Sequence, residues 1–355
     1  MHLSCSTSSS GTPNLEELPD KCQIYIQYDR DLFKSSSTFV KNQALAKLVE
    51  DRIGVPRTVE TVLGIHHFIS FVFRPNASTN LPFVDTSALC DKAITLLLNP
   101  VMIKKPRRSS NLEQLAQGLT EFQSEQKENL SEIVYMSHND HIRDIERSMF
   151  AVANWLMRSD KIKKYDDKLK IMILQSTWFL WGRFERMVMT AKMRARKQCG
   201  KKQFVISPDA LIDFEGMKSD ISCWSSHTFD EMRFFFIHSE LYYDKVIWDL
   251  MELQPNDVEI TYLLCTICFQ LVGKRFGGHV QEEIERLQDV LSNELHEYYI
   301  KNNRKIYLLR LKQLMKVKEN FLRLRNIRID KYDIGGTFNL FNMAFSNPDF
   351  FWVVV

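Results

Sequence analysis

Three charged residues lie inside a stretch that is otherwise almost entirely apolar. Arg183, Glu185 and Arg186 fall within residues 167–196, where the spacing of apolar side chains predicts one long helix with hydrophobic residues on two sides. A buried charge without a partner is costly, so each group needs an opposite charge or a polar ligand. The sequence therefore directs the search for function to the middle of this helix.

Two arrangements would satisfy the arginines. In the first, Arg183 and Arg186 pair with Glu185 or with an acid on a neighbouring helix, and the site is structural. In the second, the arginines bind the carboxylate of a lipophilic, fatty-acid-like small molecule in an apolar pocket. The expected lining of that pocket is Met149, Val152, Leu156, Trp181 and Met187. The residues alone favour the ion pair and leave the ligand open.

The other pairs of reactive side chains predict neither a metal site nor a catalytic site. His138 and His141 lack Asp, Glu or Cys partners at ligand spacing. Cys265 and Cys268 have the spacing of half a zinc site, but in an apolar stretch they are expected to pack as small hydrophobes. The sequence lacks the nucleophile-elbow, zinc-protease, P-loop and dinucleotide-binding motifs. We expect a binding protein that is not an enzyme and uses no cofactor.

Composition narrows the class of protein further. With 45% hydrophobic and 26% charged residues, the 355-residue chain has the make-up of a water-soluble globular protein with a sizeable core. A net charge of +3 is too small to predict nucleic-acid binding by itself. The seven scattered cysteines indicate a reducing compartment. Neither a signal peptide nor a membrane span is predicted.

The N-terminal third is less regular than the rest. Residues 1–20 are rich in Ser, Thr and Pro and are predicted to be disordered. Residues 21–110 mix strand-like and helix-like segments, among them a helical pattern at 86–98, and they receive no fold assignment. This region ends in a basic linker whose charge density also suits a nuclear import signal, formed by Lys104, Lys105, Arg107 and Arg108.

Residues 111–355 have the pattern of an all-α domain with one small β-hairpin. Helices are predicted at 112–127, 139–158, 167–196, 229–253, 257–273, 280–298 and 306–329. We expect Asn139 or Asp140 to cap the second of these, and Asn256 to form a capping box with Glu259. The hairpin strands are predicted at 203–207 and 211–214. Because the helix at 167–196 is apolar on two sides, it must be the middle of a three-layer antiparallel sandwich.

Several segments of this region resemble a known family. Residues 148–156 (SMFAVANWL), a charged link and residues 167–178 (DKLKIMILQSTW) are similar to the signature across helices 3 to 5 of the nuclear hormone receptor ligand-binding domain. The similarity is strongest to the nematode group related to hepatocyte nuclear factor receptors. Residues 178–186 (WFLWGRFER) and 347–351 (NPDFF) are also similar to that group. The resemblance covers residues 111–355 in order.

The resemblance implies a receptor that regulates transcription in the nucleus. It implies a lipophilic ligand in the lower half of the sandwich, and coregulator proteins on a groove between helices 3, 4 and 12. The matching groove positions are Arg158, Lys161, Lys163, Gln175 and Asp349. A homodimer or heterodimer would form through residues 306–329.

Two features depart from the family's pattern. The family's DNA-binding module needs two zinc sites of four cysteines each, yet no C-x-x-C pair precedes Ser110, so direct DNA binding is not predicted. The segment after Pro348 is short for a ligand-switched terminal helix. The alternative function is a helical protein-interaction scaffold with a filled core and no small-molecule ligand. A cavity between residues 139–158 and the tail would favour the receptor.

Overall fold

The computed structural model describes residues 70–73, 82–100, 109–221, 225, 227–236, 240–304, 306–338, 340–341 and 344–351. The predictions of disorder at 1–20 and of a nuclear import signal at 104–108 lie outside the described residues, as does most of the unassigned stretch before residue 82.

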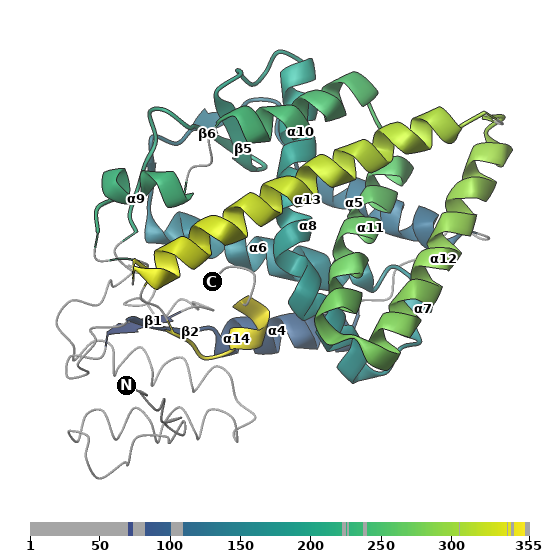
Figure 1. Ribbon diagram of the computed structural model, residues 1–355, viewed down its shortest axis with the longest axis horizontal. Coiled ribbons are helices and arrows are strands. Elements are labelled where there is room, and N and C mark those ends of the chain that lie inside the picture. Colours follow the sequence, from purple (N-terminus) through teal and green to yellow (C-terminus); the bar gives the residue numbers. More distant parts are fainter. Residues whose placement is uncertain are drawn as a thin grey trace, which may run out of the picture.

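Helices dominate the described part of the chain (Figure 1). They are α4 (Ser87–Leu98), α5 (Asn111–Gln123), α6 (His138–Leu156), α7 (Asp160–Lys163), α8 (Asp167–Ala195), α9 (Phe229–Phe236), α10 (Glu240–Leu253), α11 (Asp257–Phe276), α12 (Gly278–Lys301), α13 (Leu308–Thr337) and α14 (Pro348–Phe351). The strands are β1 (Ser70–Phe73), β2 (Pro82–Asp85), β3 (Ser131–Glu132), β4 (Tyr135–Met136), β5 (Gln203–Ser207), β6 (Ala210–Asp213), β7 (Lys218–Ser219) and β8 (Ala344–Phe345).

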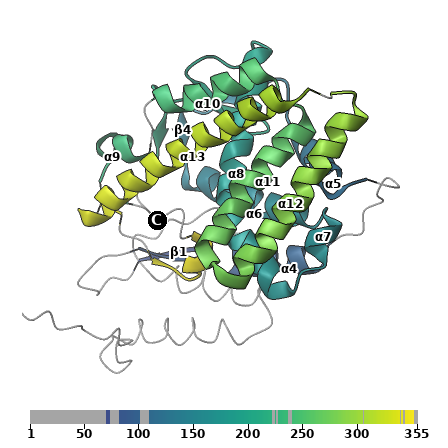
Figure 2. The same ribbon diagram turned by 45° about the vertical axis from the view of Figure 1, so that its right-hand side comes forward.

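Helix α8 forms the middle of the sandwich, as its two apolar faces predict. Trp181 packs 5.7 Å from Trp155 of α6, ring centre to ring centre, whereas Phe184 packs 5.1 Å from Phe321 of α13. In Figure 1, α13 crosses in front of α8 and α6 lies behind it. Helix α11 also packs against α8, and α11 and α12 run side by side (Figure 2). The predicted three-layer helical architecture is confirmed.

Capping residues set where these helices begin. Helix α6 starts earlier than expected, because Ser137 is the N-cap and Asp140 is its capping-box partner. Asn256 and Glu259 form the predicted capping box of α11. Residues 229–253, predicted as a single helix, contain the two helices α9 and α10. Residues 237–239 between them lie outside the described residues.

The hairpin after α8 forms where the sequence predicts it. Strands β5 and β6 pair antiparallel, with Phe204 opposite Ile212, and β3 adds a parallel strand on the far side of β6. It is therefore part of a three-stranded sheet, and β4 and β7 form a further parallel pair. Strand pairing in this half thus exceeds the one hairpin predicted.

The segment before residue 100 and the C-terminal segment are joined to each other and to the helical core. Strand β2 pairs in parallel with β8, and α4 packs against α6 and α8. The hydroxyl of Ser346 accepts a hydrogen bond from the Thr86 backbone at 2.9 Å and donates one to Asp85 at 3.1 Å. Leu89 and Leu97 of α4 are buried in the main core. None of the described helices is long and apolar enough to cross a membrane.

Candidate functional site

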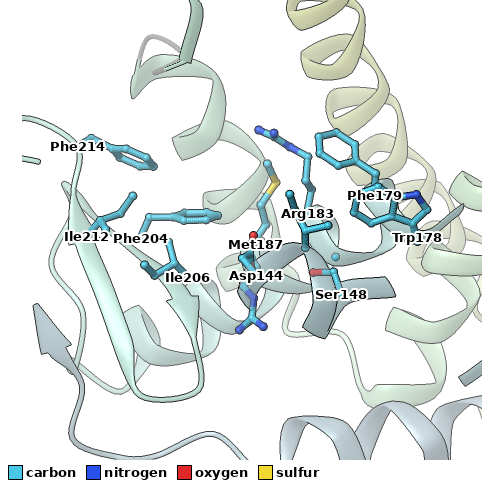
Figure 3. A pocket seen from close by; sticks show the side chains of 13 residues that line it. Asp144, Ser148, Trp178, Phe179, Arg183, Met187, Phe204, Ile206, Ile212 and Phe214 are labelled. Carbon is cyan, nitrogen blue, oxygen red and sulfur yellow. The ribbon is translucent and has the colours of Figure 1, made fainter. Parts of the chain in front are cut away.

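A cavity of about 200 Å³ lies between α6, α8 and the β5–β6 hairpin. Figure 3 shows the hairpin side chains at one end, Trp178 and Phe179 at the other, and Asp144, Ser148 and Met187 between them. Its walls are mainly apolar, and they consist of Asp144, Ile145, Ser148, Trp178, Phe179, Gly182, Arg183, Arg186, Met187, Phe204, Ile206, Ile212 and Phe214.

Helix and strand periodicity place these side chains on the cavity. In β5, Phe204 and Ile206 are two residues apart and so point to the same face of the strand. Phe204 packs 5.4 Å from Phe214, ring centre to ring centre, which closes the hairpin end. On α8, Arg183 and Arg186 are three residues apart and share one face. The hairpin is thus a wall of the cavity, a role that its alternating pattern alone does not reveal.

The predicted ion pair between Arg186 and Glu185 is present but incomplete. The Nε of Arg186 lies 3.6 Å from Oε2 of Glu185, and both side chains are almost fully buried. Neither of these two atoms has a hydrogen-bond partner. Glu185 does accept one hydrogen bond, at its other oxygen, from Gln123 at 3.2 Å. One buried guanidinium on the cavity wall therefore still lacks an acceptor at Nε.

Burial changes the acidity of two carboxyl groups near the arginines. Desolvation raises the pKa of Glu185 to about 7, against the opposing effect of Arg147. Asp144 is exposed on the cavity side, and desolvation by the protein around it raises its pKa to about 6, with Arg147 and Arg183 acting in the opposite direction. Near neutral pH, Glu185 therefore compensates the arginines less completely than an ordinary carboxylate would.

The cavity borders the N-terminal half of α6, whereas the predicted lining drew on the C-terminal half. Of the predicted ligand-binding residues, the structure places Arg183, Arg186 and Met187 on the cavity. Met149, Val152 and Leu156 are fully buried in the core and do not line it. The ring of Trp181 also faces away, packing 5.3 Å from Phe122 of α5. The sequence did not predict that the aromatic residues of the hairpin, Asp144 of α6 or Phe179 of α8 would line the cavity. Among these residues, only Asp144 offered a signal of a functional site, because it is a charged residue within an apolar pattern.

Comparison with known proteins settles the family. Residues 126–338 match the family model for the ligand-binding domain of nuclear hormone receptors. The chain belongs to the nuclear hormone receptor family. The resemblance in residues 148–186 is thereby confirmed.

Several curated Caenorhabditis elegans receptors are similar to this receptor along most of its length. Nuclear hormone receptor family member nhr-44 is 32% identical over 333 residues, which cover 92% of this chain and 77% of nhr-44. Member nhr-98 is 32% identical, covering 84% of this chain and 70% of its own length. Member nhr-130 is 30% identical, covering 92% and 74%. The family acts in transcription regulation, is typically nuclear and is generally not enzymatic.

The five positions predicted for a coregulator groove lie in separate parts of the structure. Arg158 forms an ion pair with Glu121 of α5, and Lys163 lies 3.9 Å from Asp160 of its own helix α7. Asp349 of α14 lies 3.3 Å from Arg275 of α11. Lys161, in α7, and Gln175, in α8, are partly exposed. The structure thus places the basic positions around α7 and the acidic position beside α11.

Proposed function

We propose that this receptor binds an amphipathic carboxylic acid in the cavity between α6, α8 and the hairpin, and that ligand occupancy controls coregulator binding. The observation that carries the proposal is the cavity wall itself: apolar and aromatic over most of its area, with two arginines on one face of α8. Pockets that bind lipophilic ligands combine an apolar lining with a few polar anchors in this way.

The charges on the wall favour an anionic ligand. Arg183 and Arg186 face the cavity, and Asp144 is the acid that lines it with them. Because the Nε of Arg186 has no hydrogen-bond partner, a ligand carboxylate can supply an acceptor that Glu185 does not. A carboxylate would therefore complete the bonding of a group that is already buried.

Trp178 connects the cavity to the C-terminal segment. Trp178 lines the cavity, and its indole Nε1 donates a hydrogen bond of 2.7 Å to the backbone oxygen of Phe350 in α14. A ligand that packs against this indole favours the docked position of α14, which is a population shift. We propose that the docked segment completes a coregulator groove with the basic residues near α7, Arg158, Lys161 and Lys163, and with Gln175 and Asp349.

Contacts with other proteins extend this proposal. Ile306, Leu308 and Leu309, just before and within the start of α13, are 96%, 77% and 69% exposed. Such an apolar patch suits a protein partner, and we propose a homodimer or heterodimer through residues 306–329. Regulation of transcription would then proceed through contacts with other proteins. In this proposal the 355 residues do not supply a zinc-finger DNA-binding module of their own. A scaffold with no small-molecule ligand is the second candidate, favoured by the same exposed patch.

The test is direct measurement of ligand binding by the purified protein. Native mass spectrometry should detect a bound fatty acid, and dodecanoate should bind in a calorimetric titration. Arg186→Ala or Arg183→Ala should weaken binding by about 1.5–3 kcal/mol, the scale of a charge-assisted hydrogen bond. Arg196→Ala, at the exposed C-cap of α8, is the matched control. A protein that binds no fatty acid would leave the scaffold as the function.

A further inference from the structure

Two arginines of α13 lie near Phe179 of α8, a residue that also lines the main cavity. Arg325 and Arg328 line a second, smaller cavity of about 20 Å³. The two cavities share Phe179 and Arg183 as part of their walls. In Figure 3, Arg183 lies beside Phe179, at the end of the main cavity away from the hairpin. Positive charge is thus concentrated where α8 meets α13.

The hydrogen bonds of these two arginines are incomplete. The Nε atoms of Arg325 and Arg328 are buried and have no hydrogen-bond partner in the structure. Arg328 donates to the hydroxyl of Tyr332 at 2.9 Å, whereas the bond from Arg325 to Asn326 is long, at 3.4 Å. Burial lowers the pKa of the Arg325 guanidinium, with no acid acting in the opposite direction. A buried donor without an acceptor is a costly arrangement unless a ligand completes it.

Aromatic rings hold the guanidinium groups near one another. The guanidinium carbons of Arg183 and Arg328 lie 5.4 and 5.0 Å from the centre of the Phe179 ring. Arg328 also lies 5.1 Å from the ring centre of Tyr332. Aromatic faces attract cations but cannot accept the in-plane N–H bonds of a guanidinium fork. In the described part of the chain, no carboxylate forms an ion pair with Arg325 or Arg328.

We propose that Arg183, Arg325 and Arg328 bind a phosphate or sulfate monoester group, an oxyanion with several acceptor oxygens. Three guanidinium forks match such a group better than a carboxylate, which offers two oxygens. The inference rests on the proposed function, since the apolar body of the ligand would lie in the main cavity. The second cavity is too small for more than a headgroup, and binding requires Arg325 and Arg328, which are partly exposed, to shift.

The experiment compares two probes with the same number of carbon atoms and different headgroups, dodecyl phosphate and dodecanoate, by calorimetry on the full chain. Dodecyl phosphate should bind at least about tenfold more tightly, because it gains charge-assisted hydrogen bonds. The double variant Arg325→Gln/Arg328→Gln should lose this preference and keep its affinity for dodecanoate. Arg323→Gln, exposed on the same helix, should keep the preference. Thermal melting of each variant confirms that it is folded.

A second variant separates the guanidinium fork from the bare charge. Arg325→Lys/Arg328→Lys keeps both charges and should retain only part of the preference. Inorganic phosphate tested alone distinguishes a free anion from a lipid headgroup: stabilisation of the wild type but not of the glutamine variant would assign the same site to free phosphate.

The titrations distinguish failure of the anion site from failure of the proposed main-cavity function. If dodecanoate binds but the phosphate probe binds no more tightly, or if the glutamine variant keeps the preference, the anion site is wrong and the main-cavity function stands. If neither amphiphile binds, both proposals are wrong.

Discussion

The indole of Trp178 contacts both the candidate ligand cavity and the C-terminal segment: it lines the cavity, and it donates a 2.7 Å hydrogen bond to the backbone oxygen of Phe350. Its ring also packs edge-to-face on Phe351, 5.5 Å between ring centres, and Phe351 in turn stacks on Phe345 of β8 at 4.5 Å. One side chain of α8 therefore connects the candidate cavity directly to α14.

Replacing this indole should release α14. Trp178→Phe removes the donor and leaves the Phe350 carbonyl without its partner, at a cost of about 1–2 kcal/mol. Hydrogen exchange in residues 344–351 should accelerate by roughly tenfold while exchange in α11 stays unchanged. Trp248→Phe is the control, since Trp248 is 56% exposed on α10. Unchanged exchange in the C-terminal segment would contradict the proposed path.

A buried carboxylate ties α11 to the start of α13. Glu259 is inaccessible to solvent, and it receives hydrogen bonds from Tyr299 at 2.9 Å and from two nitrogens of Arg310 at 2.9 and 2.7 Å. Burial alone would raise its pKa, but the bonds from Arg310, the Asn256 backbone and Tyr299 outweigh burial and lower the pKa below the ordinary 4.5. We predict that Glu259→Gln lowers the free energy of unfolding by about 3 kcal/mol at pH 7, because it removes the charged partner of the partly buried Arg310 in this ion pair.

The pH dependence of that loss follows from the lowered pKa. A carboxyl with a lowered folded-state pKa contributes stability above its unfolded pKa, and the contribution disappears as the pH falls through the folded value. Denaturant titrations of wild type and Glu259→Gln should therefore differ most at neutral pH and converge well below pH 4.5. Glu282→Gln, which breaks only exposed ion pairs with Arg286 and His279, should change stability by about 0.5 kcal/mol or less. A difference that persists in acid would contradict this assignment.

Glu185 should show the opposite pH dependence. Because burial raises its folded-state pKa to about 7, its stabilising contribution is complete below the unfolded pKa and is lost as the pH rises through 7. Between pH 5 and pH 8, wild type should lose about 2 kcal/mol of stability relative to Glu185→Gln. Glu128→Gln, an exposed site on the loop after α5, should follow the wild type. Parallel curves for wild type and Glu185→Gln would contradict a raised pKa.

The sequence predicts elements better than it predicts cavities, for physical reasons that particular residues illustrate. The double apolar face of α8 requires a helix between two layers, and alternation at 203–214 requires paired strands, since both patterns depend only on neighbours along the chain. The N-cap of α6 lies two or three residues before the predicted one because Ser137 uses Asp140 in its capping box, where the common pattern has Glu or Gln.

The lining of the cavity depends on contacts between distant segments. Periodicity shows that Met149 and Val152 are buried, and both are, but it does not show whether a buried side chain meets another side chain or an empty space. That depends on where along α6 the hairpin docks, and the hairpin is more than fifty residues away in the chain. Ion pairing is hidden for the same reason: Arg158 is held by Glu121, and Asp349 by Arg275, from other helices.

The proposed coregulator groove can be tested with a peptide. A peptide with a leucine-rich helical motif should bind the receptor, with Lys161 contacting one end of the peptide helix, because cations complement a helix C-terminus. Asp349 has to serve two partners, since Arg275 already lies 3.3 Å away, so its contribution to the peptide is expected to be smaller. Lys161→Ala should therefore weaken peptide binding by about 1.5 kcal/mol, or roughly tenfold in Kd, and Asp349→Ala by less. Lys168→Ala, exposed in the first turn of α8, is the matched control.

Because α4 packs against the same helices, α6 and α8, the measurement should include Leu97→Ala, which loosens α4. Tighter peptide binding by this variant would mean that α4 covers part of the groove, whereas no binding by any variant, with or without dodecanoate, would rule out the groove.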